Sequence, residues 1–257
     1  MKIGLVLSGG GVRGLAHIGA IKALREAGIK PDMVSGSSAG AVVGALYCYG
    51  YTPEEMMEFF RVTPLFHINR FAFGKPGFID TDSFYPDFVK YFPEDDFNAL
   101  KKSLFVTTVD LLQGSLNVFH KGQLIRPLLA SSAFPGLFSP VGIDDAVYAD
   151  GGILDNFPLN PIKDLCDQKI GSYASPLDTI TPESLKYSVN VLERAIRINY
   201  SERSFLKFPY FDLLIRPVEL VTYGLLDKTR MNEIYQIGYK CARKAIQDLD
   251  ADHPLLA

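Results

Sequence analysis

The sequence predicts an α/β protein, a three-layer sandwich in which helices cover both faces of a mostly parallel central sheet. Two observations indicate this class. Apolar strand-like runs alternate with helical stretches along the chain, and two glycine-rich turns each lead from such a run into a helix. With 257 residues the chain is long enough for a sizeable core. We expect one domain over residues 1–257, with its motifs in about 1–160, an aromatic-rich region at 59–97 and further strands and helices at 170–250.

The first strand-turn-helix unit holds three consecutive glycines. Residues 3–7 form a short apolar run that is typical of a buried strand, and a helical stretch follows at 15–27. The turn between them contains Gly9, Gly10, Gly11, Arg13 and Gly14. Consecutive glycines leave backbone N–H groups free to converge on an anion at the start of a helix, so this turn is a candidate oxyanion hole. Arg13 either reinforces that site or forms a surface salt bridge.

The second unit carries a serine in the pattern G-x-S-x-G. Ser38 lies at its centre, between Gly36 and Gly40, after strand-like residues at 29–34 and before a helix of small residues at 41–50. A sharp strand-to-helix turn presents a serine nucleophile, and the helix N-terminus favours the negative charge that develops during acyl transfer. Ordinary glycine turns also show this pattern, so the pattern alone does not identify a nucleophile.

The remaining elements are predicted by periodicity and by turn residues. Thr52-Pro53-Glu54-Glu55 begins a helix that runs to about residue 62, because it supplies an N-cap, a proline at the first helical position and a capping-box acid. An Asp-Gly-Gly segment at 150–152 is first of all a turn signal. Periodic patterns further predict a hairpin at 103–110 and 115–119, a strand-turn-strand at 141–148, helices at 187–201 and 230–247, and a strand at 212–216.

Aromatic side chains are concentrated at 59–97. The twelve are Phe59, Phe60, Phe66, Phe71, Phe73, Phe78, Phe84, Tyr85, Phe88, Tyr91, Phe92 and Phe97. We expect most of them to fill a core between two helices. The functional alternative is a lid or acyl-chain pocket over Ser38, for which the loop 71–78 is the candidate, since an apolar substrate needs an apolar wall. A second aromatic run at 205–211 is a candidate contact with a membrane surface or a dimer partner.

As a set, the motifs resemble those of the patatin-like phospholipase family. Gly-Gly-Gly-x-Arg-Gly near the start, G-x-S-x-G about twenty-five residues later and Asp-Gly-Gly downstream follow the order of that family. Segments at 105–119 and 130–138 also follow its pattern, as do Asn156 and Pro158. The resemblance covers about residues 1–160.

The resemblance implies a catalytic Ser–Asp dyad. Ser38 matches the nucleophile and Asp150 matches the general base, while the matches to the oxyanion hole are Gly9, Gly10, Gly11 and Arg13. The glycines that match the supporting motif positions are Gly14, Gly36, Gly40, Gly151 and Gly152. The chemistry agrees, because a carboxylate within hydrogen-bond reach can take the proton of a serine hydroxyl directly. No cofactor or metal is expected.

Two other mechanisms compete with the dyad. Gly9, Gly11 and Gly14 also spell the dinucleotide-binding pattern G-x-G-x-x-G, but that site needs an acid at the end of the second strand, and Asp32 precedes Met33 instead. A Ser-His-Asp triad needs a histidine, which in the α/β-hydrolase order follows the acid. The four histidines are His17, His67, His120 and His253, and only His253 follows Asp150. It stands four residues from the end of the sequence, so the dyad is favoured.

Composition and hydropathy limit the other classes. A net charge of −3 suggests neither nucleic acid nor attraction to anionic lipid as a partner. Cys48, Cys166 and Cys241 are widely spaced, which is typical of free thiols in a reducing compartment and gives no zinc pattern. We find no signal peptide or membrane-spanning run, so a soluble, cytoplasmic protein is expected.

The sequence therefore predicts a serine lipid acyl hydrolase that cleaves carboxylic esters of phospholipids, lysophospholipids or glycerides through an acyl-serine intermediate. A transacylase with the same residues is a close variant. A lipid-binding or regulatory module that lacks catalysis is the alternative from another class, and a dinucleotide-binding enzyme is third. Transient contact with a membrane surface is expected. The sequence leaves open the head group, the chain length, the position cleaved and the oligomeric state.

Overall fold

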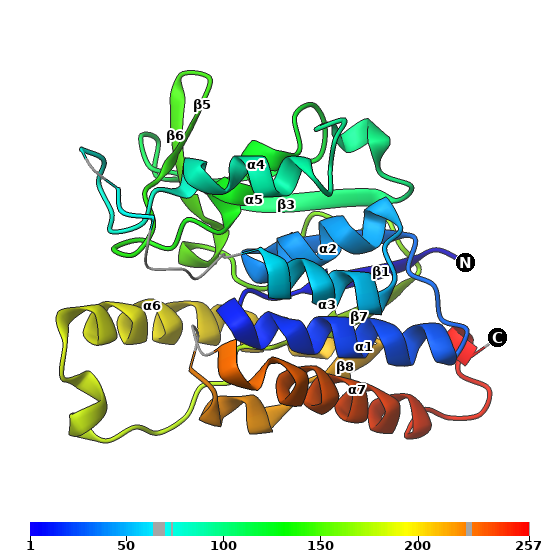
Figure 1. The fold of residues 1–257 in the computed structure, drawn as a ribbon. Helices are drawn as coiled ribbons and strands as arrows, with labels where there is room; N and C mark the ends of the chain where they lie inside the picture. The colour runs from blue at the N-terminus through cyan, green and yellow to red at the C-terminus, as the bar shows by residue number, and fades with distance from the viewer. Residues whose placement is uncertain (64–69, 73, 225–227, 257) are drawn as a thin grey trace.

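The computed structural model describes residues 1–63, 70–72, 74–224 and 228–256, without the side chains of Val189 and Lys228 (Figure 1). The described residues form one eight-stranded sheet in the order β5-β6-β3-β2-β1-β7-β8, with β4 paired to β3. The strands are β1 (Ile3–Leu7), β2 (Met33–Ser37), β3 (Ser103–Asp110), β4 (Ser115–Phe119), β5 (Val141–Ile143), β6 (Ala146–Asp150), β7 (Gln168–Ser172) and β8 (Leu213–Ile215). The run β3-β2-β1-β7-β8 is parallel, and β4, β5 and β6 are antiparallel to their neighbours.

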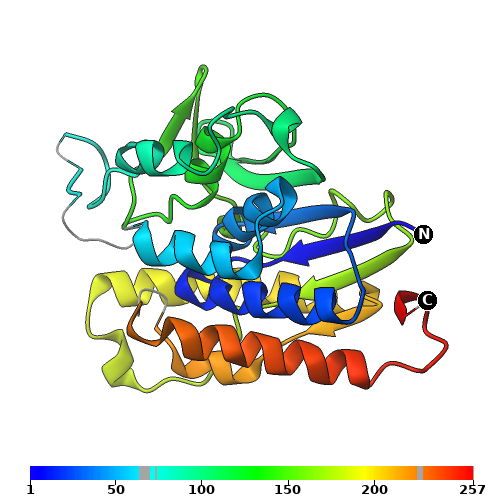
Figure 2. The ribbon, with the colours of Figure 1, turned by 45° about the vertical axis from the view of Figure 1, so that its right-hand side comes forward.

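The helices are α1 (Leu15–Glu26), α2 (Ala39–Tyr49), α3 (Pro53–Val62), α4 (Tyr85–Val89), α5 (Ile125–Ser131), α6 (Ser188–Phe205) and α7 (Met231–Gln247). Five of these helices begin close to the predicted positions, whereas α4 and α5 were not predicted. The capping box of α3 is formed, because the Thr52 side chain accepts from the Glu55 N–H and the Glu55 carboxylate accepts from the Thr52 N–H. The helices α1 and α7 lie side by side (Figure 2) and approach so closely that a Cβ atom on Gly238 would overlap the Ala16 carbonyl.

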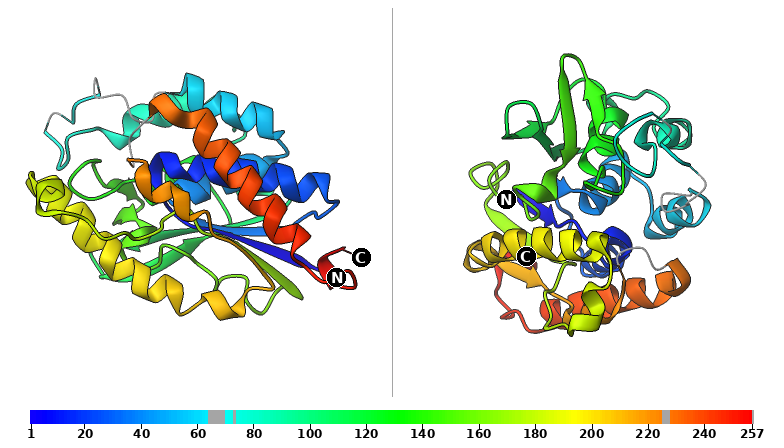
Figure 3. Two further views of the ribbon diagram at one scale, coloured as in Figure 1. Left: turned by 90° about the horizontal axis from the view of Figure 1, so that it is seen from below. Right: turned by 90° about the vertical axis from the view of Figure 1, so that its left-hand side faces the viewer.

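Both faces of the sheet are covered, which confirms the predicted fold class. Alternate residues of β1 point to opposite sides: Leu5 and Leu7 pack into the larger core, and Val6 packs into the smaller one. Figure 3 shows α1 and α7 on one side of the sheet and α6 on the other. On the α6 side, the rings of Phe157 and Tyr173 complete the smaller core.

The strand β7 was not predicted, and it lies between β1 and the edge strand β8. Beyond its carboxyl end, Ala174 donates its N–H to the Ser8 hydroxyl at 2.8 Å. The Ser175 hydroxyl donates to the Gly9 carbonyl at 2.6 Å. The segment after β7 therefore holds the glycine-rich turn that follows β1.

The aromatic region mostly fills the core, as predicted. Phe59, Phe84, Phe88, Phe92 and Phe97 are buried. In the candidate loop 71–78, however, Phe71 and Phe78 are 55% and 66% exposed. Phe66 and Phe73 lie outside the described residues.

The aromatic run at 205–211 divides between core and surface. Phe208 packs edge to face against Phe157 and Phe211 packs against it at a tilt, while Leu206 and Tyr210 are exposed. No helix among the residues that the structure describes is long and apolar enough to cross a membrane.

Candidate active site

Ser38 stands at a sharp turn between β2 and α2. Its backbone has φ 53° and ψ −128°, a conformation that L-residues rarely adopt and that is typical of strained functional sites. The turn is possible because its neighbours are glycines: a Cβ atom on Gly36 would lie 2.7 Å from the Ala41 nitrogen, and one on Gly40 would lie 2.4 Å from the Leu7 carbonyl oxygen. The half-buried Ser38 is also the N-cap of α2, where the helix dipole favours negative charge.

A residue that the sequence analysis did not single out fixes this turn. The Ser38 N–H donates to the hydroxyl oxygen of Ser131 at 2.8 Å. Ser131 is the last residue of α5 and is fully buried. A bond from a rigid helix end to the backbone of Ser38 helps to hold the strained conformation.

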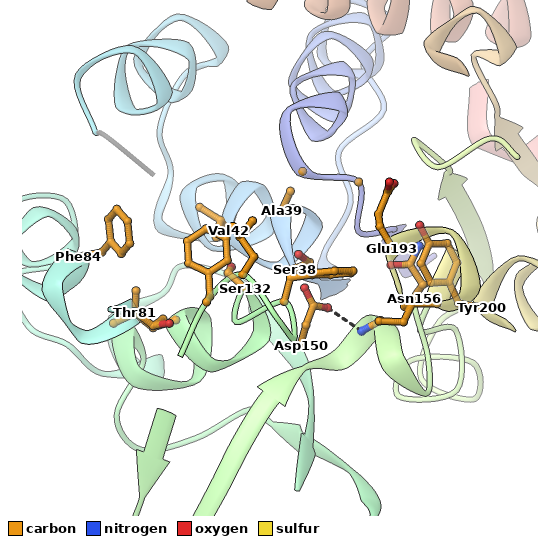
Figure 4. Close-up of a pocket in the computed structure, with 18 of the residues that line it drawn as sticks. Ser38, Ala39, Val42, Thr81, Phe84, Ser132, Asp150, Asn156, Glu193 and Tyr200 are labelled. Carbon is orange, nitrogen blue, oxygen red and sulfur yellow. Dashed lines mark hydrogen bonds between the residues drawn. The ribbon is translucent and has the colours of Figure 1, made fainter. Parts of the chain in front are cut away.

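Asp150, the last residue of β6, faces Ser38 (Figure 4). It is 4% exposed, and its Oδ1 accepts the Gly152 N–H at 2.7 Å, the bond that is dashed in Figure 4. Burial raises the pKa of Asp150 to about 6, and the hydrogen bonds from the Gly152 N–H and the Ser38 hydroxyl offset part of that rise. The structure therefore brings the two predicted dyad residues together.

The glycine-rich turn lies beside Ser38. The Gly9 N–H donates to the Asn156 carbonyl at 3.1 Å, and a Cβ atom on Gly9 would lie 3.2 Å from that of Ser38. Gly10 and Gly11 line the same cavity as Ser38. In the described part of the chain neither the Gly10 nor the Gly11 N–H makes a hydrogen bond. Their donors are thus available to an anion formed at Ser38.

Arg13 does not line this cavity. Its side chain is 3% exposed and donates from Nε to the Tyr223 carbonyl at 2.7 Å and from Nη2 to the Val221 carbonyl at 3.5 Å. Burial and the nearby charge of Arg197 lower the pKa of Arg13 to about 10. These contacts exclude the surface salt bridge considered above. They show Arg13 tying the glycine-rich turn to the segment before α7.

None of the described histidines lies beside the dyad. His17 is fully buried, and its ring bonds the Ser172 hydroxyl and the Ser8 carbonyl, each at 2.8 Å. Burial lowers the pKa of His17 to about 4. His120 is exposed against the Phe105 ring, and His253 accepts the Leu255 N–H near the end of the sequence; His67 lies outside the described residues.

The dinucleotide alternative fails at its acidic residue. Asp32 precedes β2, and its Oδ2 accepts the Ile3 N–H at 2.8 Å at the start of β1. The glycine-rich turn lies at the other end of β1. Asp32 therefore lies at the amino ends of the strands, whereas the turn would hold a phosphate at their carboxyl ends.

A cavity of about 430 Å³ opens over Ser38 and Asp150. Its walls are mainly apolar, with side chains from Val42, Phe60, Phe84, Phe88, Leu129 and Phe138. An apolar cavity with a few polar groups suits an acyl chain whose reacting carbonyl must reach a polar centre. Three of the predicted aromatic residues thus line the cavity, but neither Phe71 nor Phe78 of the candidate loop does.

Comparison with known proteins assigns the chain. A family model described as "Patatin-like phospholipase" matches residues 5–163. The chain belongs to the patatin-like phospholipase family. The matched range contains Ser38, Asp150 and the glycine-rich turn, whereas α6, which forms another wall of the cavity, lies beyond it.

Two curated relatives are lysophospholipases. "Lysophospholipase nte1" of Neurospora crassa is 27% identical over 282 residues, which cover 96% of this patatin-like chain and 18% of the relative. "Lysophospholipase NTE1" of Coccidioides immitis is 28% identical over 286 residues, with the same two shares. The chain thus spans less than a fifth of the length of these relatives.

A solved structure shares the fold. VipD from Legionella pneumophila superimposes with a TM-score of 0.56 at 16% sequence identity, over 96% of this chain and 67% of that one. At this level of identity the likeness concerns the fold of the patatin-like chain.

Proposed function

We propose that this patatin-like chain is a serine lipid acyl hydrolase with Ser38 as nucleophile and Asp150 as general base. The observation that carries the proposal is that Ser38 and the buried Asp150 carboxylate face each other in one apolar cavity (Figure 4). The family membership and the names of the lysophospholipase relatives support a lipid ester as substrate.

Catalysis follows from the geometry in two halves. Asp150 takes the proton of the Ser38 hydroxyl while Oγ bonds to the ester carbonyl carbon, and the Gly10 and Gly11 N–H groups stabilise the resulting oxyanion. The tetrahedral intermediate then breaks its bond to the leaving alcohol, which receives the proton from Asp150. In the second half Asp150 takes a proton from water, the hydroxide attacks the acyl carbon, and Ser38 regains its proton as the C–Oγ bond breaks.

The strained Ser38 and the buried Asp150 favour catalysis over a passive lipid-binding role. A module that only held an acyl chain would need the apolar walls but neither the strained Ser38 nor a buried Asp150 beside it. A transacylase uses the same residues and differs only in the acceptor of the acyl group.

The test is hydrolysis of a lysophospholipid and of p-nitrophenyl butyrate by the purified chain, together with labelling by a fluorophosphonate probe. The proposal expects turnover of both esters and a covalent label on Ser38. A folded chain that neither turns over an ester nor accepts the probe would show the proposal to be wrong.

The pH dependence of the rate reports the state of Asp150. Only the ionised carboxylate accepts the Ser38 proton, so kcat/KM is expected to rise with pH to a plateau, with its midpoint near pH 6. Below the midpoint, the rate falls about tenfold for each pH unit. The profile is measured with p-nitrophenyl butyrate, and circular dichroism at each pH checks that the chain stays folded. A midpoint near 4, the ordinary range of an aspartate, contradicts the burial argument.

Histidine variants show whether the rise of kcat/KM with pH comes from the ionisation of Asp150. His253→Ala is expected to change kcat/KM by less than about twofold. His17→Ala loses about 1–3 kcal/mol of unfolding free energy, because Ser172 and the Ser8 carbonyl lose their partner. Its rate per folded molecule is expected to stay close to that of the wild type. Both variants are measured over the same pH range. If the rise of kcat/KM with pH disappeared in either variant, that rise would belong to the replaced histidine.

A further inference from the structure

The cavity has two chemically different ends, and the dyad lies between them. In Figure 4, Val42, Thr81 and Phe84 lie on one side of Ser38 and Asp150, and Asn156, Glu193 and Tyr200 lie on the other. On the first side the Thr81 hydroxyl already donates to the Ser139 carbonyl at 2.5 Å, so that side mostly offers apolar surface. An amphiphile cleaved at Ser38 would place its acyl chain there and its polar part toward α6.

Glu193 provides a negative charge at the polar end. It lies on the inner face of α6, lines the cavity, and its side chain is 27% exposed. Its Oε1 accepts from Arg197 Nη1 at 3.3 Å, which orients the carboxylate, and its Oε2 makes no hydrogen bond in the described part of the chain. Arg197 is 6% exposed, donates from Nη2 to the Pro176 carbonyl at 2.8 Å, and does not line the cavity. The cavity therefore meets the carboxylate and not the guanidinium.

Asn156 provides a hydrogen-bond donor at the same end. It is 4% exposed, and its Nδ2 has no partner in the described part of the chain although it is buried. The Asn156 amide packs against both the glycine-rich turn and the segment after Asp150. A Cβ atom on Gly9 would lie 2.3 Å from Asn156 Oδ1, and one on Gly152 would lie 2.8 Å from it. A buried donor without an acceptor is costly, so its place in a cavity wall indicates a ligand oxygen as its partner.

We propose that the α6 end of the cavity is a head-group subsite that selects lipids with a positively charged head group. Glu193 Oε2 contacts the ammonium group, and Asn156 Nδ2 donates to an oxygen of the glycerol or of its phosphodiester. The Tyr200 side chain lies beside Glu193 at the same end of the cavity. The proposal rests on the proposed function, because it assigns the part of the substrate that leaves with the alcohol.

The charge of Glu193 decides which head groups fit. In a partly buried site an ammonium group gains from the carboxylate, whereas the uncharged glycerol ends of monoacylglycerol and of lysophosphatidylglycerol do not. With the same acyl chain, we expect lysophosphatidylcholine and lysophosphatidylethanolamine to be cleaved with higher kcat/KM than monoacylglycerol and lysophosphatidylglycerol. Comparison of the choline lipid with the ethanolamine lipid separates a requirement for positive charge from a requirement for the methyl groups on the nitrogen.

The experiment compares Glu193→Gln with wild type on these four lipids, in mixed micelles of one neutral detergent. Glutamine keeps the size and a hydrogen-bond acceptor but removes the charge. We expect kcat/KM to fall about tenfold for the two ammonium lipids and to change little for the two others. The rate with p-nitrophenyl butyrate, which has no head group, should be unchanged. Glu202→Gln, an exposed position on the same helix, is the matched control and should match wild type on every substrate.

The outcomes separate this subsite from the proposed function. An equal loss on all four lipids, or a wild type that prefers the neutral or anionic head groups, overturns the subsite while hydrolysis itself stands. The wild-type series decides even if Glu193→Gln fails to fold. A wild type that cleaves neither p-nitrophenyl butyrate nor any lipid overturns the proposed function and the subsite with it.

Discussion

Replacing Ser38 by alanine is expected to lower kcat at least about a thousandfold and to abolish fluorophosphonate labelling, because the acyl group then has no oxygen to which it can bond. The fold should survive. The Ser131 hydroxyl still accepts the backbone N–H of residue 38, and alanine keeps the Cβ atom that the turn already accommodates. Single-turnover hydrolysis of p-nitrophenyl butyrate and thermal unfolding, measured on the same sample, separate loss of chemistry from loss of structure.

The neighbouring serine is the matched control. Ser37 is fully buried at the end of β2, and its hydroxyl has no partner among the described residues. Ser37→Ala should therefore fold and retain activity. If Ser38→Ala still formed an acyl-enzyme, or if both variants lost activity equally, the assignment of the nucleophile would be wrong.

Local signals predicted the elements whose partners lie close in sequence. The capping box of α3 needs only Thr52 and Glu55, three residues apart, so it could be read directly from the chain. The strand β7 could not be predicted in this way. Its five residues, Gln168–Ser172, include one large apolar side chain, Ile170, and it is a strand because β1 and β8 pair with it. Pairing between distant segments leaves little trace in a short polar run.

The same distinction applies to the site. Ser38 and Asp150 stand in motifs whose glycines are required by tight local geometry, so the sequence indicated both. Ser131, which bonds the Ser38 N–H, is 93 residues away. The carbonyl that binds Arg13 belongs to Tyr223, 210 residues away, and no local pattern indicates this partner. Roles that arise from tertiary packing needed the structure.

Asp150→Asn is expected to reduce kcat nearly as much as loss of the nucleophile, because the amide cannot take the Ser38 proton. The substitution preserves the shape of the side chain, and its oxygen can still accept the Gly152 N–H that Asp150 binds at 2.7 Å. Activity is measured above pH 7, where wild-type Asp150 is ionised. Asp110→Asn is the control, since the Asp110 carboxylate only caps the turn after β3 and should be dispensable for the rate. Near-normal turnover in Asp150→Asn would remove Asp150 from the mechanism.

The same substitution should make the chain more stable, and the gain should depend on pH. Burial raises the pKa of Asp150 from an ordinary 3.8 to about 6. Between these values the folded state binds more protons than the unfolded state, so the wild type loses stability as pH rises through this window. Asparagine stays neutral throughout. The variant should therefore match the wild type in unfolding free energy near pH 4 and exceed it by on the order of 2–3 kcal/mol at pH 8. Urea unfolding at both pH values measures the difference. A gain that does not change with pH would mean that the buried charge of Asp150 costs the fold nothing, and a loss of stability at pH 8 would mean that the charge supports it.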